Sequence, residues 1–87
     1  MDSAEARELL GTALNRYRSE TYANLKAKLG FRETTAIIGK SGQRYRIEMQ
    51  VIWDGRPNQT IRVFGSIDDG RLRAMLPLRE DFLVDQV

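Results

Sequence analysis

Residues 60–78, TIRVFGSIDDGRLRAMLPL, decide the fold, because two runs of alternating residues meet at Asp69-Gly70. Asp-Gly favours a type I′ turn, which joins two antiparallel strands through a loop of two residues. The sequence therefore predicts a β-hairpin with one apolar face. The predicted pairs are Ile67 with Leu72, Gly65 with Ala74 and Val63 with Leu76 on that face, and Ser66 with Arg73, Phe64 with Met75 and Arg62 with Pro77 on the other.

A second hairpin is predicted before this one. Every odd position from Tyr45 to Trp53 is apolar, whereas the even positions 44 to 50 are polar, which is typical of a half-buried antiparallel strand. We expect a short strand over Thr34–Gly39 to precede it, with Ser41-Gly42 as a two-residue turn. This turn would pair Ile38 with Tyr45, Ala36 with Ile47 and Thr34 with Met49.

The first 29 residues have the pattern of a helix, because apolar residues recur at spacings of three and four. Asp2 and Glu5 form a capping-box pattern, and Gly30 is placed for a C-cap. We expect either one long helix with a bend near residues 18–19 or two helices with Ser19 as an internal cap. The last nine residues, 79–87, are predicted to form a short helical turn, an extended segment on a sheet edge or a frayed end.

Together these elements predict a single α+β domain over residues 1–87, in which an N-terminal helix packs on a four-stranded antiparallel meander. A chain of 87 residues can support one small hydrophobic core. Alternation directs Trp53 toward the helix, where we expect it to be part of that core.

Composition excludes several functional classes. The chain contains no cysteine and no histidine, which removes thiolate chemistry and the commonest general base and metal ligand. Asp54, Asp68 and Asp69 lie at separate predicted turns, so they are not expected to share a metal ion. No apolar run approaches the roughly 20 residues that span a bilayer, and the N-terminus lacks a signal-peptide pattern. We expect a cytoplasmic, non-enzymatic protein without cofactor, metal or small-molecule substrate and without membrane association.

The candidate binding surface is the sheet face turned away from the helix. Its mixture of arginine and apolar side chains fits a solvated surface neutralised by Glu48 and Asp68, a contact with a protein partner or a second copy, or a platform for single-stranded RNA or DNA. The net charge of only +2 gives nucleic acid little support, so protein contact is the preferred hypothesis. The predicted surface consists of Arg44, Arg46, Arg62, Phe64, Arg73 and Met75, with Ile37 and Ile52 between them.

Residues 45–54 and 61–70, with Arg73-Ala74, Pro77-Leu78 and Asp81-Phe82, resemble a group of short uncharacterised prokaryotic proteins. Those proteins are similar in a Gly-Ser-Ile-Asp-Asp-Gly turn, here Gly65–Gly70, and in an Asp-Phe pair near the end. The resemblance covers roughly the last half of the chain. It implies a natural prokaryotic α+β domain and assigns no activity and no site residue.

Overall fold

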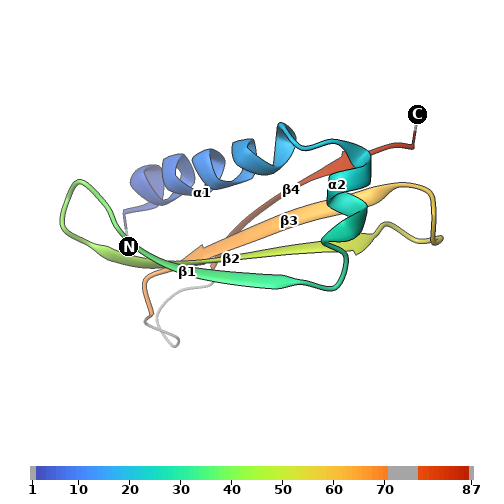
Figure 1. The fold of residues 1–87 in the computed structure, drawn as a ribbon. Helices are drawn as coiled ribbons and strands as arrows, with labels where there is room; N and C mark the ends of the chain where they lie inside the picture. Colours follow the sequence, from blue (N-terminus) through green and yellow to red (C-terminus); the bar gives the residue numbers. More distant parts are fainter. Residues whose placement is uncertain (1, 71–76, 87) are drawn as a thin grey trace.

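The computed structural model describes residues 2–70 and 77–86. Two helices, α1 (Ser3–Arg18) and α2 (Tyr22–Ala27), precede four strands, β1 (Arg32–Ile38), β2 (Arg44–Trp53), β3 (Ile61–Asp68) and β4 (Leu78–Val84). The strands form one antiparallel sheet in the order β1-β2-β3-β4, and both helices lie on the same side of it (Figure 1). The predicted α+β fold and meander are confirmed.

The N-terminal region contains two helices and not one long bent helix, so the second of the two predicted alternatives is confirmed. The Asp2 side chain caps α1 by accepting a hydrogen bond of 3.0 Å from the Glu5 N–H. Thr21 caps α2 in the same way, accepting from the Asn24 N–H at 3.1 Å. Ser19 is the C-cap of α1 and does not begin the second helix, which corrects its predicted role.

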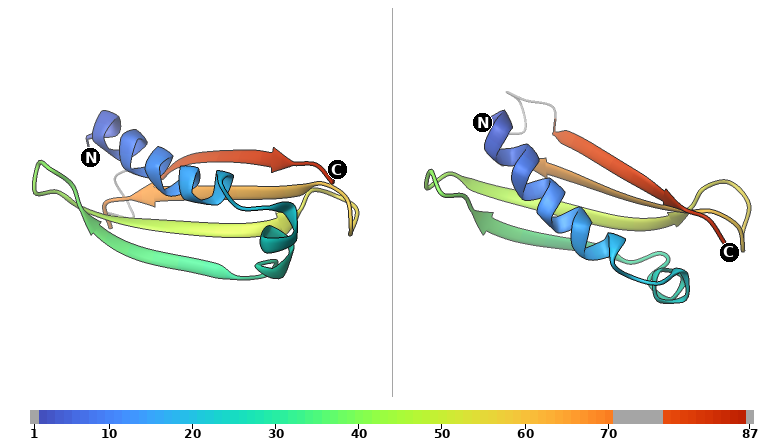
Figure 2. Two further views of the ribbon diagram at one scale, coloured as in Figure 1. Left: turned by 45° about the horizontal axis from the view of Figure 1, so that its top comes forward. Right: turned by 90° about the horizontal axis from the view of Figure 1, so that it is seen from above.

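The core lies between α1 and the middle of the sheet, which the helix crosses diagonally (Figure 2). Leu10 and Leu14 of α1 are fully buried, as are the inward side chains of β3. Gly65 makes this approach possible, since a Cβ there would lie 2.9 Å from Leu10 Cδ1 and 2.7 Å from Met49 Sδ. A glycine inside a strand often marks such a close approach.

The predicted sidedness of β2 and β3 is confirmed. Tyr45 is 3% exposed, and Trp53 is half-buried against the core. Arg46 and Arg62 project from the opposite side, because successive strand residues point to opposite faces. The side of the sheet opposite α1 is called the outer face below.

The predicted register of β1 is wrong by one residue. Ile37 lies opposite Tyr45, and Ile38 lies opposite Arg44. The loop causes this shift, because Gly42, at φ +87°, donates its N–H to the Gly39 carbonyl and makes a loop one residue longer than predicted. A slip of one residue exchanges the two faces of a strand. Ile37 therefore packs toward the helix, and Ile38 takes its place on the outer face.

The predicted hairpin at Asp69-Gly70 has the wrong register. β3 pairs with β4 so that Ile67 lies opposite Leu78 and Val63 opposite Phe82, six positions later than predicted. Gly70 still turns, at φ +81°, and its N–H donates to the Asp68 carboxylate at 2.8 Å. The final segment is thus a paired edge strand, the extended alternative. The predicted partners 71–76, including Arg73 and Met75, lie outside the described residues.

Candidate functional site: the outer face and the open edge of the sheet

The outer face collects side chains from all four strands. The observed registers place the even-numbered residues of β1, β2 and β3 beside the odd-numbered residues of β4. Four of the predicted surface residues, Arg44, Arg46, Arg62 and Phe64, come together there. Glu48 and Asp68 lie on the same face, as expected, and the structure adds Arg32, Ile38, Arg79, Asp81 and Leu83 to it.

Arg62 stands at the centre of an ion-pair cluster on this face. Its Nη2 lies 2.9 Å and its Nε 3.1 Å from Oδ1 of Asp54, and its Nη1 pairs with Asp81. The hydrogen bonds that Arg62 donates to Asp54, followed by the attraction of both carboxylates, raise the pKa of Arg62 above its usual value against the effect of desolvation. Asp54 and Asp81 come from a turn and from β4, so the cluster depends on the fold and not on a local motif.

Two further arginines of the outer face are paired. The Arg46 Nη2 lies 3.4 Å from the Asp68 Oδ2, across the β2–β3 ladder, and the Arg32 Nε lies 3.2 Å from the Glu48 Oε1. Exposed pairs of this kind contribute about 0–1 kcal/mol to stability. Their larger effect is on the field of the surface, because each carboxylate cancels a positive charge that a phosphate backbone would need.

Apolar side chains lie among these ion pairs. Ile38 is 65% exposed and Leu83 is 51% exposed, and Phe64 is half-buried. Phe64 also lines a hollow of about 260 Å³ with Arg79 and Asp81. The outer face therefore combines ion pairs with apolar groups in substantial contact with solvent, of which Ile38 lies on one edge strand and Leu83 on the other.

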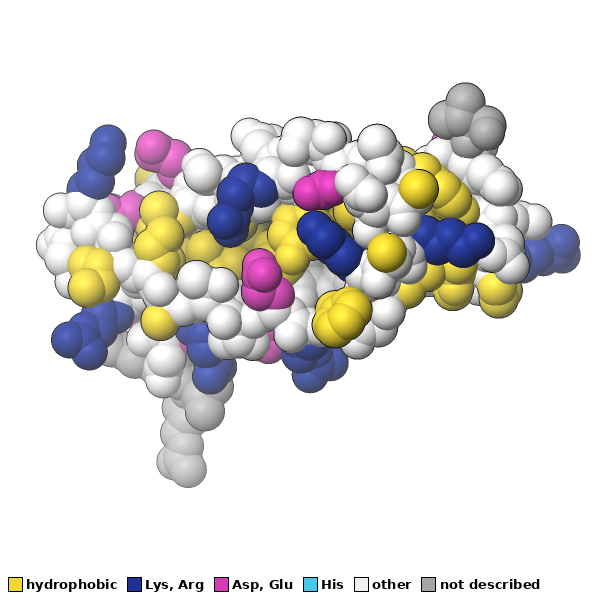
Figure 3. Space-filling model, viewed as in Figure 1, with side chains coloured by type: hydrophobic (Ala, Val, Ile, Leu, Met, Phe, Trp, Pro, Cys, Tyr) yellow, Lys and Arg dark blue, Asp and Glu magenta, His cyan; other side chains and the backbone are white. Residues whose placement is uncertain are grey.

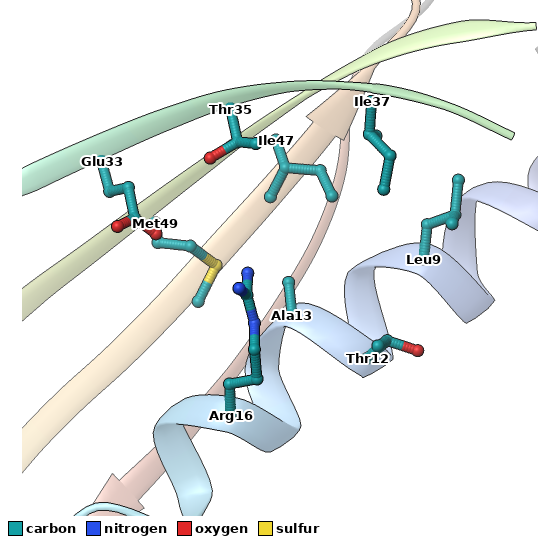
Figure 4. Close-up of a pocket in the computed structure, with 9 residues that line it drawn as sticks. All are labelled: Leu9, Thr12, Ala13, Arg16, Glu33, Thr35, Ile37, Ile47 and Met49. Carbon is teal, nitrogen blue, oxygen red and sulfur yellow. The ribbon is translucent and has the colours of Figure 1, made fainter.

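A second exposed region lies between α1 and β1. A groove of about 320 Å³ runs along this gap, and its apolar floor is visible between the helix and the edge of the sheet (Figure 3). Leu9 and Ala13 line it from the helix, and Ile37 lines it from β1 (Figure 4). Arg16 and Glu33 stand at its polar end. The sequence-based register turned Ile37 away from α1, so it missed this groove.

Glu5 joins α1 to the β1–β2 loop. Its carboxylate accepts hydrogen bonds from the Ser41 hydroxyl at 2.6 Å, the Ser41 N–H at 3.0 Å and the Tyr45 hydroxyl at 2.8 Å. These bonds, led by the one from the Ser41 hydroxyl, lower the pKa of Glu5, whereas burial and the bond to Glu5 raise the pKa of Tyr45 to about 12. A carboxylate with a lowered pKa is a weak base. Glu5 therefore has a structural role: it holds α1 to the β1–β2 loop. Its hydrogen bonds with Ser41 and Tyr45 are called the latch below.

Asp54 and Asp68 are held in ion pairs and Asp2 caps α1, and within residues 2–70 and 77–86 no three His, Cys, Asp or Glu side chains lie close enough together to hold a metal ion. Neither of the described helices has the length and apolarity needed to cross a membrane.

Comparisons of the chain with protein-family models, curated protein sequences and solved structures found no match. The resemblance to short prokaryotic proteins stays a prediction.

Proposed function

We propose that this protein is a non-catalytic cytoplasmic module that works by protein–protein contact through the outer face of its sheet. The observation that supports this most is the combination of internally paired arginines with exposed apolar side chains. Exposed apolar side chains on a small domain often mark a surface that binds another protein. Two copies meeting through their outer faces would be one form of such a contact.

Pairing of the arginines favours a protein over a nucleic acid. A strand of RNA or DNA gains its affinity from cations that replace the counterions of its phosphates. Arg32, Arg46 and Arg62 already have carboxylate partners on the protein, and these partners would have to be displaced or repelled. Phe64 is the one aromatic side chain among the described residues of this face, and base stacking usually needs several.

Substitution of the apolar groups tests the proposal. The double variant Phe64→Glu, Leu83→Glu introduces charges where a partner would bury apolar side chains, while Asn15→Glu on exposed α1 adds a charge elsewhere. Purification from the native host should recover a protein with the wild type and with Asn15→Glu, and the double variant should lose it. Recovery that is equal for all three would contradict the proposal.

The nucleic-acid alternative has its own readout. Titration of the wild type with labelled single-stranded oligonucleotides at low salt should show no binding that depends on the arginines. Affinity that falls steeply with salt and disappears in Arg44→Gln, Arg46→Gln would replace protein contact by nucleic-acid binding.

A further inference from the structure

The edge formed by β1 is open, and it is a different surface from the outer face. The Gly39 N–H donates to the Gln43 carbonyl at 2.9 Å, which fixes the phase of the β1–β2 ladder. Hydrogen-bonded positions alternate along an antiparallel pair. The backbone groups of Glu33, Thr35 and Ile37 therefore point to β2. Those of the even-numbered residues Arg32, Thr34, Ala36 and Ile38 point away from the sheet.

Residues 34–38 of β1 lack the features that usually protect an edge strand. Proteins block their edges with proline, lysine, bulges or repeated charges. β4, the other edge, carries three consecutive charges at residues 79–81, whereas residues 34–38 of β1 are uncharged and contain no proline. All residues of β1 except Ile37 are exposed. A strand can therefore be added at β1 but is disfavoured at β4.

The two most exposed large apolar side chains of the described residues lie at the two ends of this edge. Phe31, directly before β1, is 67% exposed, and Ile38, its last residue, is 65% exposed. Phe31 lines a hollow on the helix side with Tyr17 and Val51. An occupant that covers both ends must run along the whole of β1.

We propose that β1 pairs antiparallel with β1 of a second copy, about a two-fold axis through Thr35, to form a continuous eight-stranded sheet. Thr35 is the midpoint of Arg32–Ile38, so the two strands overlap completely in this register. Thr34 lies opposite Ala36 of the second copy, and Arg32 lies opposite its Ile38. All of these are the even-numbered residues whose backbone groups are free to bond.

The side chains suit the same register. The aliphatic stem of Arg32 covers the exposed Ile38 of the second copy. Phe31 comes opposite Gly39 of the second copy, beside a hollow of about 220 Å³ that Leu9 and Lys40 help to line. Glu33 lies opposite Ile37, and Thr35 opposite Thr35, so no like charges are directly opposed. A dimer of this kind leaves the outer face of each copy exposed. The two outer faces together then form a surface of twice the area.

A single introduced thiol tests both the contact and its register, because the chain has no cysteine of its own. Thr35→Cys places two thiols on the axis at a non-hydrogen-bonded pair, with Cα atoms about 4.5 Å apart, which a disulfide can bridge. Thr34→Cys is the matched control, since the two Cα atoms at this position lie about 8 Å apart in the same dimer, beyond that reach. Diamide should give a covalent dimer with Thr35→Cys and leave Thr34→Cys monomeric. Equal cross-linking of both variants would overturn the register.

Sedimentation of non-cross-linked protein gives a second test. Ala36→Pro removes an N–H that points to the free edge, which an edge strand tolerates, and it should make the protein monomeric. Ala36→Val keeps this donor and should remain a dimer, as should Phe64→Glu on the outer face. A wild type that stays monomeric at millimolar concentration would overturn the proposal. So would a dimer that survives Ala36→Pro and dissociates in Phe64→Glu, because that result would place the contact on the outer face.

Discussion

β1 and β3 are strands of similar length in one sheet, yet their side chains lie in opposite environments. In β3, Ile61, Val63 and Ile67 are completely buried beneath the helix layer. In β1, Ile37 alone is partly buried. β1 is held by pairing with β2 on one side, whereas β3 is paired on both sides and covered by α1.

This difference separates the residues that stabilise the fold from those available for binding. Burial of apolar side chains under α1 supplies the hydrophobic free energy of this small domain. β1 contributes little to that core and keeps backbone donors and acceptors on its free side. Substitutions in the two strands should therefore have different consequences, and the following predictions compare them.

The largest expected effect is on the covered half of the sheet. Leu10→Ala removes a completely buried side chain and should lower the free energy of unfolding by about 2–5 kcal/mol, as expected for a cavity in a core. Ile38→Ala at the open edge should change the stability of the monomer by less than about 0.5 kcal/mol. Urea unfolding monitored by circular dichroism measures both values. Equal losses in the two variants would show that β1 belongs to the core.

A smaller effect is expected when volume is added. Gly65→Ala forces Leu10 or Met49 to move and should cost about 1–3 kcal/mol. Ala36→Val adds volume at an exposed position of β1 and should be close to neutral in the monomer. If Gly65→Ala is neutral as well, α1 does not approach β3 as closely as described.

The latch that Glu5 forms with Ser41 and Tyr45 lies at the end of β1. The pKa of Glu5 is lower in the folded protein than its ordinary value of 4.5, so its hydrogen bonds stabilise the fold fully above that pH. This contribution is lost as the pH falls through the lowered pKa. Glu5→Gln should therefore lower the Tm at neutral pH, and its difference from the wild type should shrink in acid.

Glu8→Gln is the matched control for this latch, because Glu8 is exposed on the same helix. Its melting curve should follow the wild type at every pH. A Glu5→Gln variant with an unchanged Tm at neutral pH would mean that the latch does not hold the loop to α1.

Strand sidedness could be predicted from the sequence where one face is buried. Alternation in residues 45–53 and 61–67 directed Trp53 inward and Arg46 and Arg62 outward, as the structure shows. The same pattern could not fix the pairing of β3 with β4. A shift by six residues keeps the parity of a strand, so Phe82 can replace Leu76 opposite Val63 on the same apolar face.

Prediction was weakest where burial is weakest. β1 has no clear alternation, so the prediction of its register depended on the length of the loop. The loop is one residue longer than predicted, and Ile37 therefore takes the position toward the helix that was predicted for Ile38. Four of the six predicted surface residues share the outer face. The two carboxylate partners of Arg62, Asp54 and Asp81, were not predicted, because those contacts cross a turn and a strand whose placement depends on the correct register.

Amide hydrogen exchange along β1 tests the open edge most directly. The N–H groups of Thr35 and Ile37 point to β2 and should be protected at every protein concentration. Those of Thr34 and Ala36 should be protected at high concentration and lose that protection on dilution, as a second copy dissociates. Rapid exchange of Thr34 and Ala36 at all concentrations would contradict the account of β1 as a strand that pairs with itself.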